Sequence, residues 1–378
     1  MKILVFAAFY LPLRGGYVES LHGLMKRLVG KGHRVKIVTC NTHQTFLSEI
    51  IEGVEILRLP CWNPQWLNQS YPLPQFLPTI KVFRQLAQEK FDLVSTQTRF
   101  YPTTWIGFFF ARLRGLPVVH TERGAFHTSS QSFLVRFAGW LIDHTLGWLV
   151  CRFADATVGV SQAACNFAEH LGARQPVLIY NGIDIDFWSK NQSTPEAAIP
   201  QLTFVGRLVY AKGAQDLIRA FPAPNFQLNI VGDGPYRSYL ERLVKNLDLE
   251  SRVRFWGELA IVDIKKVFGE TTVFVNPSYS EGLPRSVLEA AASGLPIVAS
   301  DVGGTREILI DEDHGLLFPA GKVDQLQKKI EMLLANESLR QKIGQNVKNH
   351  IQSSFNWSLC AASAEKLFLA VAARSANG

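Results

Sequence analysis

Two glutamates stand eight positions apart in a stretch that reads SYSEGLPRSVLEAAASGLP. Pro284 suits the first position of a helix, where its missing N–H would have no partner, and residues 286–292 are rich in helix formers. The pattern predicts that Glu281 precedes the helix and that Glu289 lies in its second turn. The pair could serve as the acid and base of a glycosidase, as two acceptors for hydroxyls of a bound ligand, or merely as solvated surface carboxylates.

Basic residues and glycines occupy two other predicted turns between a strand and a helix. Arg207 and Lys212 lie five positions apart in GRLVYAKG, just before a helix. One basic residue there is usually solvated, but two of them indicate a clamp for a diphosphate. Gly15 and Gly16 lie in LRGGYVES, where bare backbone N–H groups can approach an anion closely. A plain tight turn is the alternative for this glycine pair.

These turns require a scaffold in which strands and helices alternate. Short apolar runs suggest strands, and longer helical stretches at 19–31 and 78–89 separate several of them. The predicted strands cover residues 2–8, 34–40, 92–97, 117–121 and 156–160, and then begin again at 201, 227, 252, 272 and 295. The alternation, which runs twice, predicts an α/β protein with two doubly wound parallel sheets. Ligands of such sheets bind outside the carboxyl ends of the strands.

Composition supports a globular chain of more than one domain. A chain of 378 residues exceeds the size at which one core usually keeps growing, and the polar segment SKNQSTPEAAIP suggests a linker near residues 186–200. Hydrophobic residues make up 47% and charged residues 19%, which excludes a disordered protein. Five scattered cysteines without a CxxC spacing argue against a disulfide framework or a thiolate zinc site and fit a reducing cytoplasm.

Two apolar segments could be mistaken for membrane signals. The start, MKILVFAAFYLPL, lacks a small-residue cleavage site, so a buried first strand is expected. Residues 133–150 are long enough to be considered for a membrane span, but Arg136, Asp143 and His144 interrupt them. A largely buried helix is predicted there.

The motifs together resemble glycosyltransferase family 4. The segments GGYVE, VVHTERG, YNGID, FVGRLVYAKG, VGDGP and SDVGGTREI, with the two glutamates, occur in the order typical of that family. The resemblance covers essentially the whole chain. It implies a retaining, nucleotide-sugar-dependent enzyme of the GT-B fold, with two Rossmann-like domains facing each other across a cleft. The expected parts are an acceptor-binding domain (1–185), a donor-binding domain (186–355) and a final helix (356–378) that crosses back to the first domain.

The resemblance also implies a role for each matching residue. Arg207 and Lys212 would hold the donor diphosphate, Glu289 the ribose hydroxyls, and Glu281 the transferred sugar. His120 would lie close to that sugar. Further contacts to the donor are expected from Gly15, Gly16, Gly282 and Leu283. The nucleotide base would lie near the loop at residues 257–259, and residues 181–184 match the family's NGID turn that leads out of the first domain.

The implied chemistry needs positive charge more than a proton donor. A diphosphate leaving group is stabilised by fixed cations, for which a glycosidase has no use. No residue presents itself as a covalent nucleophile, so front-face attack is favoured, with a diphosphate oxygen deprotonating the acceptor. No DxD pair ends a strand, so neither a catalytic metal nor a cofactor is expected beyond a UDP- or GDP-sugar as co-substrate. An epimerase, a phosphorylase and a non-catalytic nucleotide-binding protein are the alternatives on this scaffold.

Charge is distributed unevenly and bears on the acceptor. Residues 1–185 contain 18 basic and 11 acidic residues, whereas residues 186–378 contain 21 of each. Residues 58–136 hold nine of these basic residues, with aromatic residues beside Arg99, Arg112 and Arg114. We expect a cytoplasmic protein that docks to an anionic membrane surface at the inner face of the cell membrane. The expected acceptor is a lipid-linked sugar. A soluble acceptor is the alternative, and no motif indicates nucleic acid.

Overall fold

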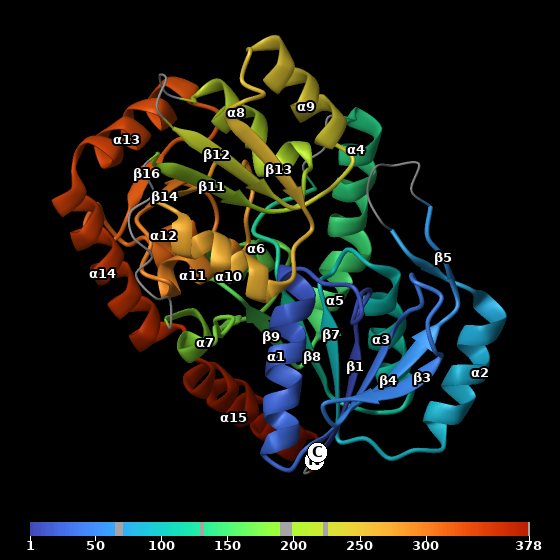
Figure 1. Ribbon diagram of the computed structural model, residues 1–378. Coiled ribbons are helices and arrows are strands. Elements are labelled where there is room, and N and C mark those ends of the chain that lie inside the picture. The colour runs from blue at the N-terminus through green and yellow to red at the C-terminus, as the bar shows by residue number, and fades with distance from the viewer. Residues whose placement is uncertain (65–70, 129–131, 190–198, 222–225, 377–378) are drawn as a thin grey trace. The chain divides into compact units, whose positions relative to one another are not determined.

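The protein is described by a computed structural model that covers residues 1–64, 71–128, 132–189, 199–221 and 226–376 (Figure 1). The chain divides into two compact units. Unit 1 comprises Met1–Gly182 and Trp357–Gly378, and unit 2 comprises Ile183–Asn356. Most of the linker expected near residues 186–200 lies outside the described residues.

Unit 1 is built on an eight-stranded sheet of order β10-β9-β8-β7-β1-β2-β4-β3, in which only β3 pairs in antiparallel fashion. Its strands are β1 (Lys2–Phe6), β2 (Arg34–Cys40), β3 (Ser48–Ile51), β4 (Val54–Leu59), β7 (Leu93–Gln97), β8 (Val118–Glu122), β9 (Ala156–Gly159) and β10 (Val177–Leu178). A separate hairpin pairs β5 (Cys61–Trp62) with β6 (Leu73–Pro74).

The first strand shows why these runs are continuously apolar. Ile3 and Val5 belong to one buried cluster, and Leu4 and Phe6 to another. Successive side chains of a strand point to opposite faces, so both faces of the sheet are covered by helices. The helical segments of unit 1 are α1 (Gly16–Gly30), α2 (Phe76–Ala87), α3 (Pro102–Leu113), α4 (Phe133–Ile142), the π-helical turn η1 (Asp143–Gly147), α5 (Trp148–Phe153), α6 (Gln162–His170) and α15 (Trp357–Ala376).

The last helix belongs to unit 1 although it follows unit 2 in the chain. Helices α15 and α1 lie side by side, in dark red and blue in Figure 1. Trp357 makes this contact close: a Cβ added to Gly23 of α1 would lie 2.3 Å from its indole, and one added to Gly182 would lie 2.4 Å from it. Small residues at both positions are therefore required by packing.

Unit 2 has a six-stranded, all-parallel sheet of order β13-β12-β11-β14-β15-β16. Its strands are β11 (Gln201–Val205), β12 (Gln227–Val231), β13 (Val253–Gly257), β14 (Val273–Asn276), β15 (Ile297–Ser300) and β16 (Leu316–Phe318). Its helices are α7 (Ile185–Ser189), the 3-10 turn η2 (Tyr210–Lys212), α8 (Ala214–Arg219), α9 (Arg237–Asn246), α10 (Ile261–Glu270), α11 (Arg285–Ala292), α12 (Thr305–Ile308), α13 (Val323–Ala335) and α14 (Glu337–Ser354).

The strand order of unit 2 fixes where a ligand is expected. Numbered from the start of the unit, the order is 3-2-1-4-5-6, the doubly wound Rossmann arrangement. The direction of winding reverses between β11 and β14, which are neighbours. In such sheets the crevice at this reversal, outside the carboxyl ends of the strands, binds ligands.

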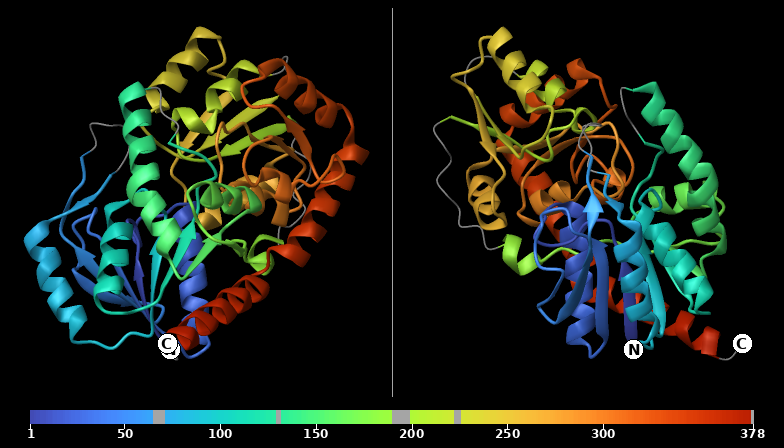
Figure 2. Two further views of the ribbon diagram at one scale, coloured as in Figure 1. Left: turned by 180° about the vertical axis from the view of Figure 1, so that it is seen from behind. Right: turned by 90° about the vertical axis from the view of Figure 1, so that its right-hand side faces the viewer.

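One expectation about the fold is wrong. Residues 133–142 form a helix, but it is not largely buried: only Gly139 of α4 is enclosed. Phe133, Leu134, Phe137, Trp140 and Leu141 are among the exposed large apolar side chains, with Phe133 at 68%. Farther along the segment Asp143, Gly147 and Val150 are buried, and the charged Asp143 is tolerated there because it pairs with an arginine inside unit 1. Helices α4 and α5 run on through η1 as one column in both views of Figure 2. Within the described part of the chain, no helix combines the length and apolarity needed to cross a membrane.

Candidate donor site

The two central strands of unit 2 bring the predicted site residues together. The chain leaves β11 into a loop that ends at Lys212, and it leaves β14 into a loop that carries Glu281. Because these strands are parallel neighbours, both loops emerge at the same edge of the sheet. Two residues that are 69 positions apart in sequence therefore meet at the reversal of the sheet.

Lys212 and Glu281 form an ion pair, with 2.6 Å between Nζ and Oε1. The hydroxyl of Ser278 donates a second hydrogen bond to the same Oε1, at 2.7 Å. The side chain of Lys212 is 30% exposed and that of Glu281 only 8%. The carboxylate is thus held by two donors, while the ammonium keeps access to solvent and to an incoming anion.

Tyr279 ties the two loops to each other. Its ring stacks on that of Tyr210 at 5.1 Å and 14°. Its backbone N–H donates to the carbonyl of Ala211 at 2.8 Å, and its hydroxyl donates to Asp216 at 2.6 Å. Burial and the acceptor Asp216 both raise the pKa of Tyr279 above its usual value. These contacts hold the two loops together, so the positions of Lys212 and Glu281 relative to each other are fixed.

Two glycines make the close approach of the loops possible. Gly213 has φ +71°, and a Cβ there would lie 1.9 Å from the carbonyl oxygen of Pro277. Gly303 has φ +52°, and a Cβ there would lie 1.8 Å from the carbonyl oxygen of Glu281. The neighbouring Gly304 donates its N–H to Gly282 at 2.9 Å. The sequence motif around residues 300–308 thus shapes the backbone beneath Glu281.

Helix α11 carries the second glutamate. It begins at Arg285, so Pro284 is the residue before the helix and not its first member as the sequence suggested. No side chain caps this end, which leaves amides of its first turn for a ligand. Glu289 is nearly buried and accepts a hydrogen bond from Nε of Arg285 at 2.8 Å. Leu283 is buried just before the helix.

Arg207 lies two residues after the end of β11 and is exposed. Within the described residues, no ion pair links it to either glutamate. The structure therefore assembles Lys212, Glu281 and Glu289 around one sheet edge and leaves Arg207 as a surface cation in the loop before Lys212. Gly257, in the loop expected near the nucleotide base, ends the outermost strand β13.

In unit 1 the glycine pair opens helix α1. Gly15 has φ +152° and ψ 160°, a conformation essentially confined to glycine, and nothing lies within 4 Å of an added Cβ. Gly16 is the first residue of α1, whose N-terminus has no side-chain cap. The backbone there is accessible, as anion binding requires.

His120 lies within β8 and is fully buried. Its Nδ1 pairs with the hydroxyl of Thr96 at 2.9 Å. Its Nε2 has no hydrogen-bond partner in the described structure and stands 3.6 Å from Glu122, too far for a hydrogen bond. A buried nitrogen without a hydrogen-bond partner is costly, so Nε2 of His120 is an exception that calls for an explanation.

A buried ion network next to His120 was missed by the sequence analysis. Arg99 bonds Glu122 at 2.9 Å and Asp143 at 2.8 Å, and all three side chains are at most 4% exposed. Arg99 was expected in a basic membrane-facing surface, and that expectation is wrong because two carboxylates hold it inside unit 1. Burial raises the pKa of Glu122, but Arg99, His120 and the Gly124 amide outweigh burial and lower it to about 2.

Ser278 and Arg285 were also missed. Each is polar and lies within five residues of a predicted glutamate, at three positions before Glu281 and four before Glu289. The spacing of Arg285 and Glu289 is the one at which side chains meet on a helix, so that pair was open to prediction.

Two family models match the chain. "Glycosyltransferase Family 4" matches residues 14–187, and "Glycosyl transferases group 1" matches residues 186–350. An uncharacterized glycosyltransferase of Methanocaldococcus jannaschii is 28% identical over 97% of this chain and 98% of its own. A phosphatidylinositol N-acetylglucosaminyltransferase subunit of Arabidopsis thaliana is 26% identical over 89% of this chain and 74% of its own.

A solved structure has a similar fold. HepE of Anabaena, crystallised in complex with UDP-glucose, superimposes with a TM-score of 0.79. It is 21% identical, over 97% of this chain and 99% of the HepE chain.

Proposed function

Because the chain belongs to glycosyltransferase family 4 and has the GT-B fold with two Rossmann-like domains, we propose that it transfers a sugar from a nucleotide diphosphate sugar to an acceptor hydroxyl, with retention and without a catalytic metal ion. The observation that carries the proposal is the Lys212–Glu281 pair at the winding reversal of unit 2. The ammonium of Lys212 can bind a diphosphate, and the neighbouring carboxylate of Glu281 can accept hydrogen bonds from sugar hydroxyls.

Lys212 and Arg207 have the role of stabilising the leaving diphosphate. Negative charge grows on this group as the glycosidic bond breaks, and a preorganised donor aimed at such charge is worth about 3 to 4 kcal/mol. A bound diphosphate would compete with Glu281 for the Lys212 ammonium. Glu281 is then released toward the hydroxyls of the sugar, with Ser278 still orienting it. Uncapped amides at the start of α11 and the open backbone at Gly15 and Gly16 support anion binding in each unit.

Glu289 is assigned to the ribose hydroxyls. It shares its carboxylate with Arg285, which fixes its orientation. Glu281 is assigned to the hydroxyls of the sugar and not to covalent attack, so the acceptor attacks from the front face and its proton passes to an oxygen of the leaving diphosphate. Neither glutamate acts as a general acid in this scheme.

The assignment separates the two glutamates experimentally. A thermal-shift screen of UDP- and GDP-sugars identifies the donor, and release of nucleotide diphosphate with and without acceptor measures transfer and hydrolysis. Glu289→Gln should chiefly weaken donor binding, whereas Glu281→Gln should chiefly slow transfer. A protein that binds a nucleotide sugar but never releases the sugar would instead be a non-catalytic binding protein.

For the acceptor we propose a lipid-linked sugar at an anionic membrane surface, on the cytoplasmic side. Helix α4 supports this proposal, because its exposed apolar side chains could enter the interface of a bilayer. Arg112 and Arg114 are exposed and basic, although Arg112 pairs with Asp155. The plant relative named above acts, by its name, on phosphatidylinositol. This acceptor is consistent with those features.

Liposome flotation tests the membrane proposal. We expect binding to anionic vesicles that weakens as salt screens exposed charges over about 8 Å at physiological ionic strength. Phe133→Ser with Phe137→Ser should reduce flotation, whereas Val262→Ser, which alters an exposed apolar residue of unit 2, should not. Equal flotation with anionic and neutral lipids would refute the proposal and favour a soluble acceptor.

A further inference from the structure

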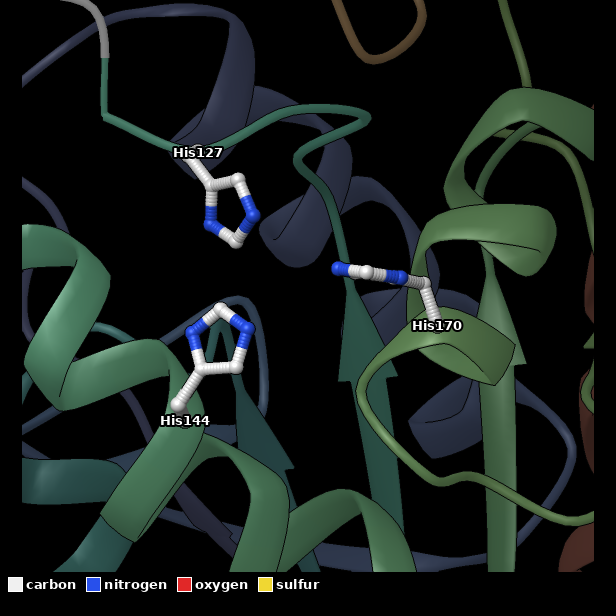
Figure 3. Close-up of side chains that lie close together, drawn as sticks. All are labelled: His127, His144 and His170. Carbon is white, nitrogen blue, oxygen red and sulfur yellow. The ribbon is translucent and has the colours of Figure 1, made fainter.

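Three histidines that the glycosyltransferase reaction does not use come together in unit 1. His127 lies in the loop after β8, His144 in the π-helical turn η1, and His170 at the end of α6. One ring nitrogen of each lies within 4.8 Å of those of the other two. Figure 3 shows the rings of His127 and His144 facing each other, with a nitrogen of His170 pointing toward the space between them.

Hydrogen bonds prepare two of these rings to bind a cation. Nδ1 of His127 pairs with a carboxylate oxygen of Asp143 at 2.7 Å, and Nδ1 of His144 pairs with the carbonyl of Trp140 at 2.9 Å. Both partners only accept hydrogen bonds, so each neutral ring carries its proton on Nδ1 and a lone pair on Nε2. Metal-binding histidines usually donate their other N–H to a carboxylate or a carbonyl in this way.

The residues around the three histidines also resemble the surroundings of a metal site. Trp140 packs on His144 at 4.4 Å, and Phe167 packs on His127 at 5.0 Å, which gives the cluster apolar walls. The π-helical turn supplies both His144 and the buried Asp143. Such turns occur frequently at functional sites. Aromatic packing alone explains the ring contacts but does not require three nitrogens to converge or two rings to share one tautomer.

We propose that His127, His144 and His170 bind one Zn²⁺ ion, with water as the fourth ligand. Imidazole nitrogens suit zinc, and tetrahedral Zn–N bonds of about 2.1 Å place the nitrogens about 3.4 Å apart. Closing from 4.8 Å requires small ring rotations, which the exposed His144 and His170 can make. The ion joins three segments of unit 1 that are remote in the sequence.

Hydrogen bonds and ion pairs connect the histidine cluster to the surroundings of His120. Asp143 bonds His127 on one side and Arg99 on the other. Arg99 in turn bonds Glu122, whose carboxylate lies 3.6 Å from Nε2 of His120. None of the three zinc ligands belongs to the proposed donor site. In the proposed site, zinc would hold the loop after β8 and, through His127, the carboxylate that orients Arg99.

Calorimetric titration with ZnCl₂ tests the proposal on the full chain, freed of any purification tag and dialysed against a chelator. We expect one saturable site per chain and a higher melting temperature with the metal. His144→Ala and His170→Ala should each weaken zinc binding by at least about tenfold, the lower bound for loss of even an outer hydrogen-bond partner. Both rings are exposed, so both metal-free variants should melt like the wild type.

His43→Ala is the matched control, because His43 is an exposed histidine of unit 1 outside the cluster. It should leave zinc affinity and stoichiometry unchanged. CoCl₂ provides a second readout, since a tetrahedral imidazole site gives a visible absorption that both cluster variants should lose. Absence of saturable binding in the wild type, or equal affinity in both cluster variants, would overturn the proposal. A loss in His43→Ala as large as in the cluster variants would overturn it as well.

Discussion

Replacing Lys212 by methionine removes one charge while keeping an unbranched apolar side chain. The structure predicts two separable effects. For stability, Glu281 is left 8% exposed with Ser278 as its remaining side-chain donor. Leaving a buried acceptor without its partner costs about 1 to 3 kcal/mol, which corresponds to a fall in melting temperature of about 2 to 12 °C for a unit of this size.

The effect on catalysis should be larger. Loss of one preorganised donor at the leaving group lowers turnover by about 100- to 1000-fold. The assay is release of nucleotide diphosphate from the donor that the thermal-shift screen identifies. Lys266→Met is the matched control, because Lys266 is 77% exposed and pairs with Asp263 in the same unit. It should change neither turnover nor melting temperature appreciably.

The double variant Lys212→Met, Glu281→Gln separates the two effects. A neutral side chain at position 281 no longer needs a cation, so part of the lost melting temperature should return. Turnover should stay low, because the diphosphate still lacks its cation. If folded Lys212→Met turns over within about threefold of the wild type, a difference below about 0.7 kcal/mol, Lys212 does not stabilise the leaving group.

Three further predictions concern the scaffold. Gly303→Ala should lower the melting temperature and turnover together, because its Cβ would overlap the carbonyl of Glu281 at 1.8 Å and φ is +52°; unchanged stability would show that the loop yields freely. Glu122→Gln breaks the buried pair with Arg99 and should destabilise the protein by about 3 to 5 kcal/mol near neutral pH. Since the folded pKa of Glu122 is lowered from 4.5 to about 2, its contribution is complete above pH 4.5 and is lost toward pH 2, so the melting temperatures of variant and wild type should converge over that interval. Truncation after Asn356 removes α15 and should lower the melting temperature of unit 1, and a shortened protein with full activity and unchanged melting would contradict the packing seen here.

The sequence predicted the central strands and the loops that follow them. Strands β1, β2, β7, β8 and β9 lie within a residue or two of the predicted runs, because apolar runs buried on both faces are a local signal. Strands β3, β4 and β10 were not predicted. The reversal of winding between β11 and β14 was also out of reach, since strand order is set by contacts that no local pattern records.

Side-chain partnerships account for most of the remaining differences. Arg99 was interpreted as a surface charge, but its partners lie 23 and 44 residues away in the chain. The same ion pair explains why Asp143 can be buried at the end of a helix whose apolar residues are exposed. The three clustered histidines are 17 and 26 positions apart, spacings that match no metal-binding motif. Lys212 and Glu281 were predicted as functional residues, but their direct contact was not.

The place of helix α15 in the chain determines the order in which the two units can complete their folding during synthesis. Residues 183–356 form one uninterrupted stretch, so unit 2 has all of its sequence as soon as Asn356 has left the ribosome. Unit 1 begins first but finishes last, because the indole of Trp357 must fill the space beside Gly23 and Gly182. Domains generally fold as units during translation. The nascent chain therefore carries an incomplete unit 1, with the α15-binding face of α1 uncovered, for the whole time that unit 2 is being made, and this interval is when a chaperone would be needed most.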